Sequence, residues 1–112
     1  EMSYNFTHIK GDTFEAVNFA LVKNNVVVNL TGAVIKMQLR TECGGLIALS
    51  LTSVASAGIT ITNAAGGLFR INKQIINIAS GNYLYDLEIL FSDGTIKTWL
   101  SGEFLIECDI TR

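Results

Sequence analysis

The sequence contains no proline, only one histidine and only two cysteines among its 112 residues. A hydrolytic triad needs a histidine held by an acid, and the lone His8 has no G-x-S-x-G motif to accompany it. Zinc sites need clustered cysteine and histidine ligands, and no D-x-D-x-D-G loop offers oxygen ligands for calcium. We therefore expect no enzymatic activity, no metal and no cofactor.

The two cysteines are far apart in the sequence, and nothing in it places them close enough for a disulfide bond. Cys108 alternates in phase with Phe104, Ile106 and Ile110, which predicts a buried, unreactive thiol. Cys43 lies in the glycine-containing connection T-E-C-G-G. We expect two free thiols and a reducing compartment.

Charge is also scarce, because charged residues make up 16% of the chain and the net charge is −2. This balance gives no electrostatic footprint for nucleic acid or anionic lipid, and no apolar run approaches membrane-spanning length. We expect neither a nucleic-acid partner nor a membrane. We expect no secretory leader, and Met2 looks like the natural start.

The few charges are distributed unevenly. Basic residues predominate in the range 20–80, whereas acidic residues predominate in the range 81–110. One interpretation is a pair of complementary faces that bind a neighbouring subunit head to tail. The other, which is the more common arrangement, is a set of solvated faces on different sheets.

The sequence is rich in short apolar segments with alternating side chains, and 49% of its residues are apolar. We expect a single domain over residues 1–112. In the range 33–40, apolar side chains occupy every second position, which predicts a half-buried strand. The ranges 58–62 and 68–72 flank the loop N-A-A-G-G and predict a hairpin.

Two further segments are less regular. Residues 13–23 predict a strand whose apolar phase slips by one residue between Ala16 and Val17, as a β-bulge would cause. Asn24-Asn25 then predicts a turn. Residues 73–80 fit either a short helical crossover or an irregular sheet edge.

The closing part of the chain predicts a hairpin centred on Asp93-Gly94, taken as a two-residue loop. Counting outward from the loop gives a register with one consistent apolar side. The expected pairs on that side are Phe91–Ile96, Ile89–Thr98 and Leu87–Leu100, and those on the other side are Leu90–Lys97, Glu88–Trp99 and Asp86–Ser101.

The preceding residues, S-G-N-Y-L-Y, have the pattern of the tyrosine corner in immunoglobulin-like sandwiches. We expect Tyr83 to return its hydroxyl group to the backbone upstream, and Tyr85 to point inward. The range 103–110 alternates again and predicts the last strand. Together these patterns predict an all-β fold, an immunoglobulin-like antiparallel β-sandwich of about seven to nine strands.

In this register Trp99 lies on the outer, polar side of its strand, where an exposed aromatic side chain indicates a contact surface. The expected interface contains Trp99, Leu90, Leu84 and Leu105, with Lys97 and Glu88 at its rim. The alternative is that the chain covers this face itself, with Tyr4, Phe6 and Ile9 or with the range 73–80.

Several segments also resemble a domain of tailed-phage and prophage structural proteins, the N-terminal domain of the baseplate upper protein type. The resemblance rests on G-D-T-F at 11–14, L-T-G at 30–32 before M-Q-L-R, G-N-Y-L-Y-D-L-E-I at 81–89, D-G at 93–94, Gly102-Glu103-Phe104 and D-I-T at 109–111. These segments follow one another in order over nearly the whole chain.

The resemblance implies a β-sandwich adaptor without catalysis, made in the bacterial cytoplasm and assembled into the virion tail or baseplate. Its expected partners are other phage structural proteins and further copies of itself. Members of this family usually continue into a longer receptor-binding or linker region, whereas this sequence stops at Arg112. The alternative function is a carbohydrate-binding β-sandwich module, in which Trp99 stacks on a sugar ring.

Overall fold

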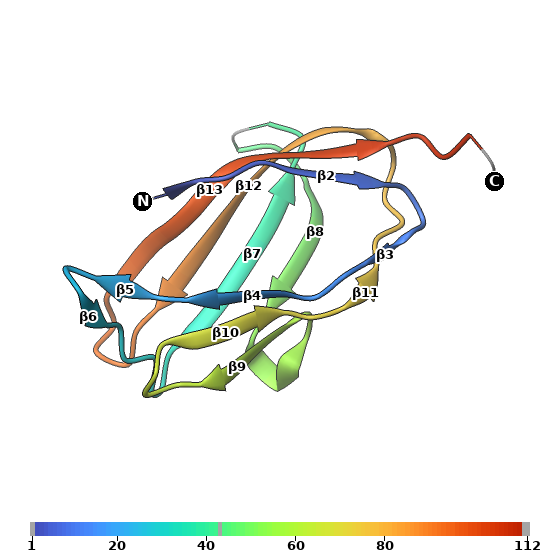
Figure 1. The fold of residues 1–112 in the computed structure, drawn as a ribbon. Helices are drawn as coiled ribbons and strands as arrows, with labels where there is room; N and C mark the ends of the chain where they lie inside the picture. The colour runs from blue at the N-terminus through green and yellow to red at the C-terminus, as the bar shows by residue number, and fades with distance from the viewer. Residues whose placement is uncertain (1, 43, 111–112) are drawn as a thin grey trace.

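The chain folds into two β-sheets packed face to face, as the computed structural model of residues 2–42 and 44–110 shows (Figure 1). The first sheet contains β1 (Met2–Ser3), β2 (Phe6–Ile9), β7 (Val34–Arg40), β8 (Ile47–Thr52), β12 (Gly81–Leu90) and β13 (Ile96–Glu107). The second contains β4 (Val17–Ala20), β9 (Ile59–Asn63) and β10 (Leu68–Ile71). Two small pairs are β3 (Thr13–Phe14) with β11 (Gln74–Ile75) and β5 (Val22–Lys23) with β6 (Val26–Val27).

The strand order is that of an immunoglobulin-like sandwich. The first sheet runs β1-β13-β12-β7-β8 and the second runs β4-β10-β9, so that β4, β10 and β9 take the places of strands B, E and D opposite strands C, F and G. Eight of the strands in the described residues have four or more residues, in line with the predicted seven to nine. The predicted fold class is therefore confirmed, except that β1 and β2 pair with β13 in parallel.

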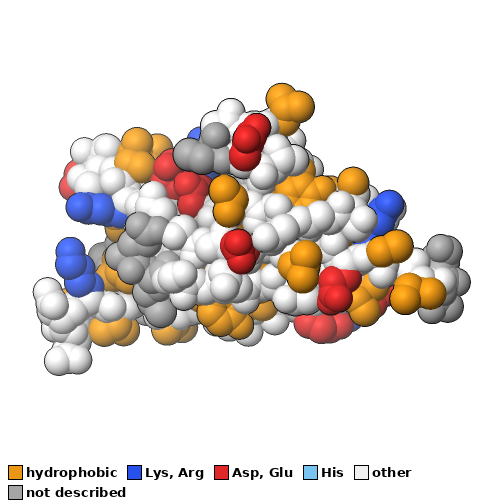
Figure 2. Space-filling view, turned by 90° about the horizontal axis from the view of Figure 1, so that it is seen from above, with side chains coloured by type: hydrophobic (Ala, Val, Ile, Leu, Met, Phe, Trp, Pro, Cys, Tyr) orange, Lys and Arg blue, Asp and Glu red, His pale blue; other side chains and the backbone are white. Residues whose placement is uncertain are grey.

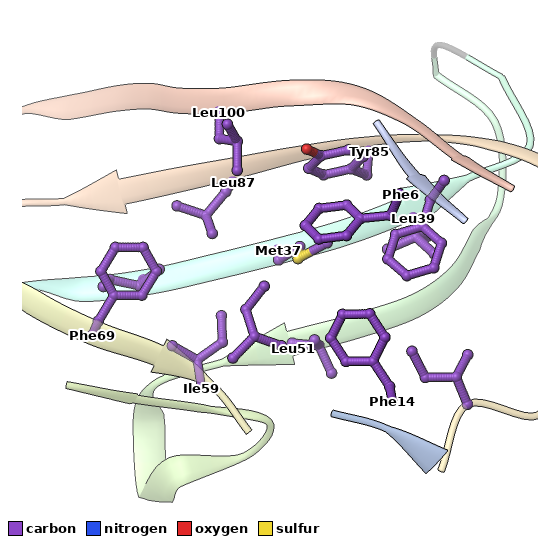
Figure 3. Close-up of a cluster of buried hydrophobic side chains, with 14 of the residues drawn as sticks. Phe6, Phe14, Met37, Leu39, Leu51, Ile59, Phe69, Tyr85, Leu87 and Leu100 are labelled. Carbon is purple, nitrogen blue, oxygen red and sulfur yellow. The ribbon is translucent and has the colours of Figure 1, made fainter. Parts of the chain in front are cut away.

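The core forms where the alternating apolar side chains of both sheets meet. On β7, Ile35, Met37 and Leu39 are at most 1% exposed, as the alternation in 33–40 predicts. Side chains of the opposite sheet, Ile59 and Phe69 among them, close this core from the other side (Figure 3). Burial of each such side chain stabilises the fold by about 1.5–3 kcal/mol.

An aromatic cluster fixes the N-terminal strands to the first sheet. Phe6 of β2 stacks on Phe104 with ring centroids 5.0 Å apart and meets Tyr85 edge to face at 5.4 Å. Phe6 is thus buried in the core, whereas Tyr4 and Ile9 remain exposed. The alternative that these residues cover the outer face of the sheet is wrong, because β1 and β2 pair with β13 and widen the sheet at that edge.

The structure corrects the prediction for the range 13–23 and decides between the two alternatives for the range 73–80. The range 13–23 is not one bulged strand, because β3 pairs with β11 whereas β4 pairs with β10. The range 73–80 forms the short strand β11 and then irregular chain, so the interpretation as an irregular edge is correct and the helical one is wrong. Asn24 and Asn25 do form the turn between β5 and β6, with positive φ angles of 53° and 63°.

The end of the last strand also differs from the prediction. β13 stops at Glu107, the thiol of Cys108 is exposed, and Ile110 is 97% exposed. The expectation of an inward-pointing Cys108 is therefore wrong, because no neighbouring strand continues the ladder beyond Glu107. Cys43 lies outside the described residues. No helix in the described part of the chain has the length and hydropathy needed to cross a membrane.

Candidate functional site: a loop groove and the outer sheet face

Between β12 and β13, a hydrogen bond from Phe91 to Thr95 closes a loop of three residues, Ser92, Asp93 and Gly94, rather than the expected two. The N–H group of Phe91 donates to the carbonyl oxygen of Thr95 at 2.8 Å, and the N–H group of Gly94 donates to the carbonyl oxygen of Phe91 at 3.0 Å. Gly94 has a φ of 89°, which a glycine adopts without strain. This is the three-residue hairpin with glycine in the left-handed conformation.

The longer loop shifts the ladder by one residue near the turn. The observed pairs are Leu90–Ile96, Ile89–Lys97 and Glu88–Thr98, so four expected pairs, Phe91–Ile96, Leu90–Lys97, Ile89–Thr98 and Glu88–Trp99, are wrong. The register shifts back between Leu87 and Glu88, and the expected pairs Leu87–Leu100 and Asp86–Ser101 are present. Trp99 is the residue without a partner, so it is the extra residue of a β-bulge.

The bulge determines where the indole ring of Trp99 lies. Trp99 is half-buried and packs against the hydrophobic core, instead of standing on the outer face of the sheet. It lines a groove of about 930 Å³ between the β5–β6 hairpin and the β12–β13 loop. The expected outward orientation of Trp99 is therefore wrong.

This loop groove has an apolar part and a polar part. Trp99, Phe91 and Val28 provide apolar walls, and Lys97 and Lys23 bring positive charge. The remaining lining residues are Val22, Asn24, Asn29, Thr31, Ser92, Asp93, Thr95 and Thr98. Most of these residues carry hydroxyl or amide groups, which donate and accept hydrogen bonds, and Asp93 carries a carboxylate, which accepts them.

Two local interactions shape the polar part of the loop groove. The N–H group of Thr95 donates to Oδ1 of Asp93 at 2.9 Å, and this bond, followed by the bond with the Thr95 side chain, lowers the pKa of the Asp93 carboxyl. Across the groove, the N–H group of Thr31 donates to Oδ1 of Asn29 at 2.9 Å. Both loops are thus held by their own side chains.

The sequence did not reveal the loop groove, because its residues are far apart along the chain. Val28 and Asn29 lie in the connection between β4 and β7, which is the B–C connection of an immunoglobulin-like domain. Phe91 and Thr95 flank the F–G loop. B–C and F–G loops lie at the same end of an immunoglobulin-like sandwich, so the predicted fold class already implied that these two loops lie close together.

The outer face of the first sheet carries the other residues of the expected interface. Leu84 and Leu105 lie near one end of this face and are 41% and 38% exposed. Leu90 lies at the other end, 37% exposed, in a cross-strand row with Val34 and Ile96. We call Val34, Leu90 and Ile96 the outer row.

The expected interface is thus divided between two surfaces. Trp99 and Lys97 line the loop groove, whereas Leu84, Leu90, Leu105 and Glu88 belong to the outer sheet face. Figure 2, seen from above the view of Figure 1, shows hydrophobic side chains as separate groups with acidic side chains between them.

The basic and acidic parts of the sequence meet on this outer face. Lys36 of β7 pairs in register with Glu88 of β12, and Gln38 lies opposite Asp86. The expectation that the two charge groups form separate faces is wrong for Lys36 and Glu88, because adjacent strands carry them on one face. A shallow groove of about 860 Å³ runs over this region.

The described residues include no group of three or more histidine, cysteine, aspartate and glutamate side chains arranged to hold a metal ion. Nε2 of His8 lies 2.9 Å from the carbonyl oxygen of Asp12, and the His8 ring meets Phe14 edge to face. These contacts give His8 a structural role at the start of the sandwich.

Comparisons with known proteins add little to this description. No protein-family model matches the chain, and no curated protein matches its sequence. Among solved structures, the crystal structure of CopC from Methylosinus trichosporium OB3b is similar, and the alignment covers 92% of this chain and 84% of the CopC chain. The two share 16% sequence identity, with a TM-score of 0.47.

Proposed function

We propose that this chain is a non-catalytic structural domain of a phage or prophage tail or baseplate, which assembles with other virion proteins and with copies of itself. Two of the segments that carry the resemblance lie in the β12–β13 hairpin. Residues 81–89 form most of β12 with its tyrosine corner, and residues 93–94 lie in the β12–β13 loop. Assembly is the role that such an adaptor would have in a virion.

The observation that carries an assembly role is the outer row. Leu90 and Ile96 are 37% and 58% exposed, and they lie side by side on adjacent strands with Val34. Cross-strand aliphatic neighbours on an exposed sheet face form an apolar surface that a partner can cover. A polar band with Asp86 and Glu88 adjoins it on β12, which supplies the polar rim typical of protein interfaces.

The proposal is tested on purified particles. Phage particles are prepared from the bacterium that carries the gene, and peptides of this chain are measured by mass spectrometry, with antibody labelling in the electron microscope. We expect a fixed number of copies for each tail and labelling at the tail or baseplate. Particles that lack the chain contradict the proposal.

A matched pair of variants tests the outer row in the same particles. Ile96→Lys places a charge in the row, and we expect it to lower incorporation by at least about tenfold, the effect of 1.4 kcal/mol. Thr7→Lys places the same charge on β2, away from the row, and should leave incorporation unchanged. Equal incorporation of both variants means that another surface makes the contact.

A second candidate function is carbohydrate binding, which the loop groove favours. The groove places the indole of Trp99 beside several hydroxyl and amide groups and the carboxylate of Asp93. Sugar rings present an apolar face that stacks on aromatic rings and hydroxyl groups that need hydrogen-bond partners. The combination of one aromatic wall with Asn24, Asn29 and Asp93 fits such a ligand.

A glycan array followed by calorimetry tests this second candidate. We expect saturable binding of at least one glycan, and Trp99→Ala should weaken it about thirtyfold or more, corresponding to the 2 kcal/mol of a central aromatic contact. Leu105→Ala on the outer sheet face is the matched control and should bind normally. An array without any saturable ligand contradicts this function.

A further inference from the structure

Strand β8 ends the strand order of the six-stranded sheet, and β7 is its only partner strand among the described residues. Its outer edge is free up to Thr52, which forms an isolated parallel bridge with Gly58. Its sequence is I-A-L-S-L-T, and no charged residue occurs between Glu42 and Arg70. The side chain of Ser50, near the middle of the strand, is exposed. The edge is therefore apolar, uncharged and accessible.

The backbone hydrogen bonds show which groups of β8 point away from β7. The N–H group of Ser53 donates to the carbonyl oxygen of Ile35, toward β7, whereas the N–H group of Thr52 donates to Ala57 on the other side. Because N–H groups alternate along a strand, that of Ser50 points the same way as that of Thr52. No backbone acceptor faces the N–H group of Ser50 in the described part of the chain.

Natural sheets protect such edges with proline, lysine or strong irregularity. This chain has no proline, and β8 has no lysine. One register shift near Ala48 is the only irregularity in its pairing, and Leu49–Thr52 pairs regularly with β7. Leu46, just before β8, is 84% exposed, and Ile47, the first residue of β8, is 47% exposed. Apart from the bulge at Ala48 and the bond from Thr52 to Ala57, the edge lacks the usual protection, and the backbone N–H group of Ser50 is open beside apolar side chains.

We propose that β8 pairs with β8 of a second copy of this chain, antiparallel and across a two-fold axis, so that the two first sheets join into one continuous sheet. Antiparallel pairing of a strand with its own copy satisfies two-fold symmetry directly. An uncharged strand meets its copy without like-charge repulsion, and it carries no charge pattern that would select a different strand. Backbone hydrogen bonds from Ser50 then supply affinity, as in other strand additions.

This inference deepens the proposed assembly role, because it identifies the surface through which copies of the chain join. It does not use the outer row, which remains available to another virion protein. The two surfaces lie on different parts of the sheet, one at its β8 edge and one on the outer face of β7, β12 and β13.

The test is the association state of the purified chain, measured by size-exclusion chromatography with light scattering over micromolar to millimolar concentrations. We expect a dimer that dissociates on dilution. Ser50→Pro removes an N–H group that β7 does not use, and edge strands tolerate proline at such positions. This variant should raise the dimer dissociation constant at least about tenfold, whereas Ser50→Ala should leave it unchanged.

A second substitution keeps the test valid if the proline variant folds poorly. Ser50→Lys retains the backbone and places two like charges near the two-fold axis, so it should also give a monomer, with an unchanged circular dichroism spectrum. A wild-type chain that is monomeric at all concentrations overturns the inference. A dimer that neither Ser50→Pro nor Ser50→Lys weakens also overturns it.

These outcomes are separate from the test of the proposed function. If the chain is found in virions but is monomeric in solution, the structural role stands and the β8 pairing fails. If the chain dimerises through β8 but is absent from virions, the pairing stands and the proposed function fails.

Discussion

The hydroxyl group of Tyr83 donates a hydrogen bond of 2.6 Å to the carbonyl oxygen of Ala79, four residues earlier in the chain. The Tyr83 ring is only 6% exposed, so the bond lies at the margin of the core. It ties the irregular connection after β11 to the first part of β12. This is the tyrosine corner expected from S-G-N-Y-L-Y, and it is confirmed.

Removing this bond should destabilise the fold without changing it. Tyr83→Phe keeps the ring and leaves the Ala79 carbonyl without its partner, at an expected cost of about 1–2 kcal/mol in the free energy of unfolding. Urea denaturation measures this as a lower midpoint with an unchanged slope. Tyr4→Phe, at a side chain that is 55% exposed, is the control and should cost less than about 0.5 kcal/mol. Equal stability of the two variants would contradict a structural role for the corner.

Tyr85 should make the fold sensitive to alkaline pH. Its hydroxyl donates to the carbonyl oxygen of Tyr4 at 2.5 Å, and burial, with a smaller contribution from the charge of Tyr4, raises its pKa far above the usual range. The folded chain therefore holds this proton more firmly than the unfolded chain does. Stability is complete below the unfolded pKa of about 10 and is lost as the pH rises above it.

Two variants separate this effect from general alkaline denaturation. Tyr85→Phe should cost about 1 kcal/mol at neutral pH and should then lose less stability than the wild type as the pH rises above about 10. Tyr83→Phe retains Tyr85 and should keep the full alkaline loss. Urea midpoints at neutral and alkaline pH measure both. Parallel pH profiles for the wild type and Tyr85→Phe would exclude Tyr85 as the cause.

The features that the sequence predicted well depend on nearby residues alone. The alternation in 33–40 specifies which side chains of β7 enter the core, and the Asn24-Asn25 pair specifies a turn with positive φ. In both cases the physical cause, either side-chain period or backbone conformation, acts within a few residues. Such features can be derived without knowing what the segment pairs with.

The β12–β13 register shows where local reasoning fails. An Asp-Gly pair fits a two-residue loop, but it equally fits the last two positions of a three-residue loop, which is the loop that forms. The bulge at Trp99 then shifts the register back, so the expected pair Leu87–Leu100 is correct despite the error at the turn. Alternation cannot locate this bulge, because the bulged Trp99 and the next residue, Leu100, are both apolar.

The candidate site depended on this register and on long-range geometry. Because Trp99 is the bulged residue, it joins the loop groove rather than the leucines of the outer face. Its neighbours in the groove include Val28 and Asn29, which only the packing of the two sheets brings near it. The leucines were placed on the correct face, since β12, with Leu84 and Leu90, and the part of β13 around Leu105 follow simple alternation. Whether either surface is an interface stays a prediction.

Asp93 should stabilise the β12–β13 loop in a pH-dependent way. Its lowered pKa, caused first by the N–H group of Thr95, means that folding favours the carboxylate. The contribution is present above the unfolded pKa of about 3.9 and is lost as the pH falls through the lower folded value. Asp93→Asn should therefore be less stable than the wild type at neutral pH and nearly equal to it at strongly acidic pH. Asp86→Asn, on the outer sheet face, is the charge-matched control, and the same pH dependence in both variants would contradict the assignment.

Gly102 lets the N-terminal strand approach β13 closely. A Cβ atom at this position would collide with the backbone carbonyl group of Tyr4, and it would lie 2.7 Å from Oδ1 of Asn5. The same stretch is held by hydrogen bonds of 2.9 Å from the N–H group of Tyr4 to the carbonyl oxygen of Ser101 and from the N–H group of Glu103 to Asn5. Any side chain at 102 must displace this strand.

Gly102→Ala should therefore destabilise the chain by about 1–3 kcal/mol, the usual cost of overpacking. Hydrogen exchange should become faster at the amide of Tyr4 through local opening of the N-terminal strand. The exchange rates of the β7 amides should change only as much as the free energy of global unfolding requires. A chain that lacks residues 1–5 provides the control, because it has no backbone for the new methyl group to meet. In that shortened chain Gly102→Ala should cost much less, so the two changes should be strongly non-additive. An equal cost in both backgrounds would place the strain within β13 itself and not in its contact with the N-terminal strand.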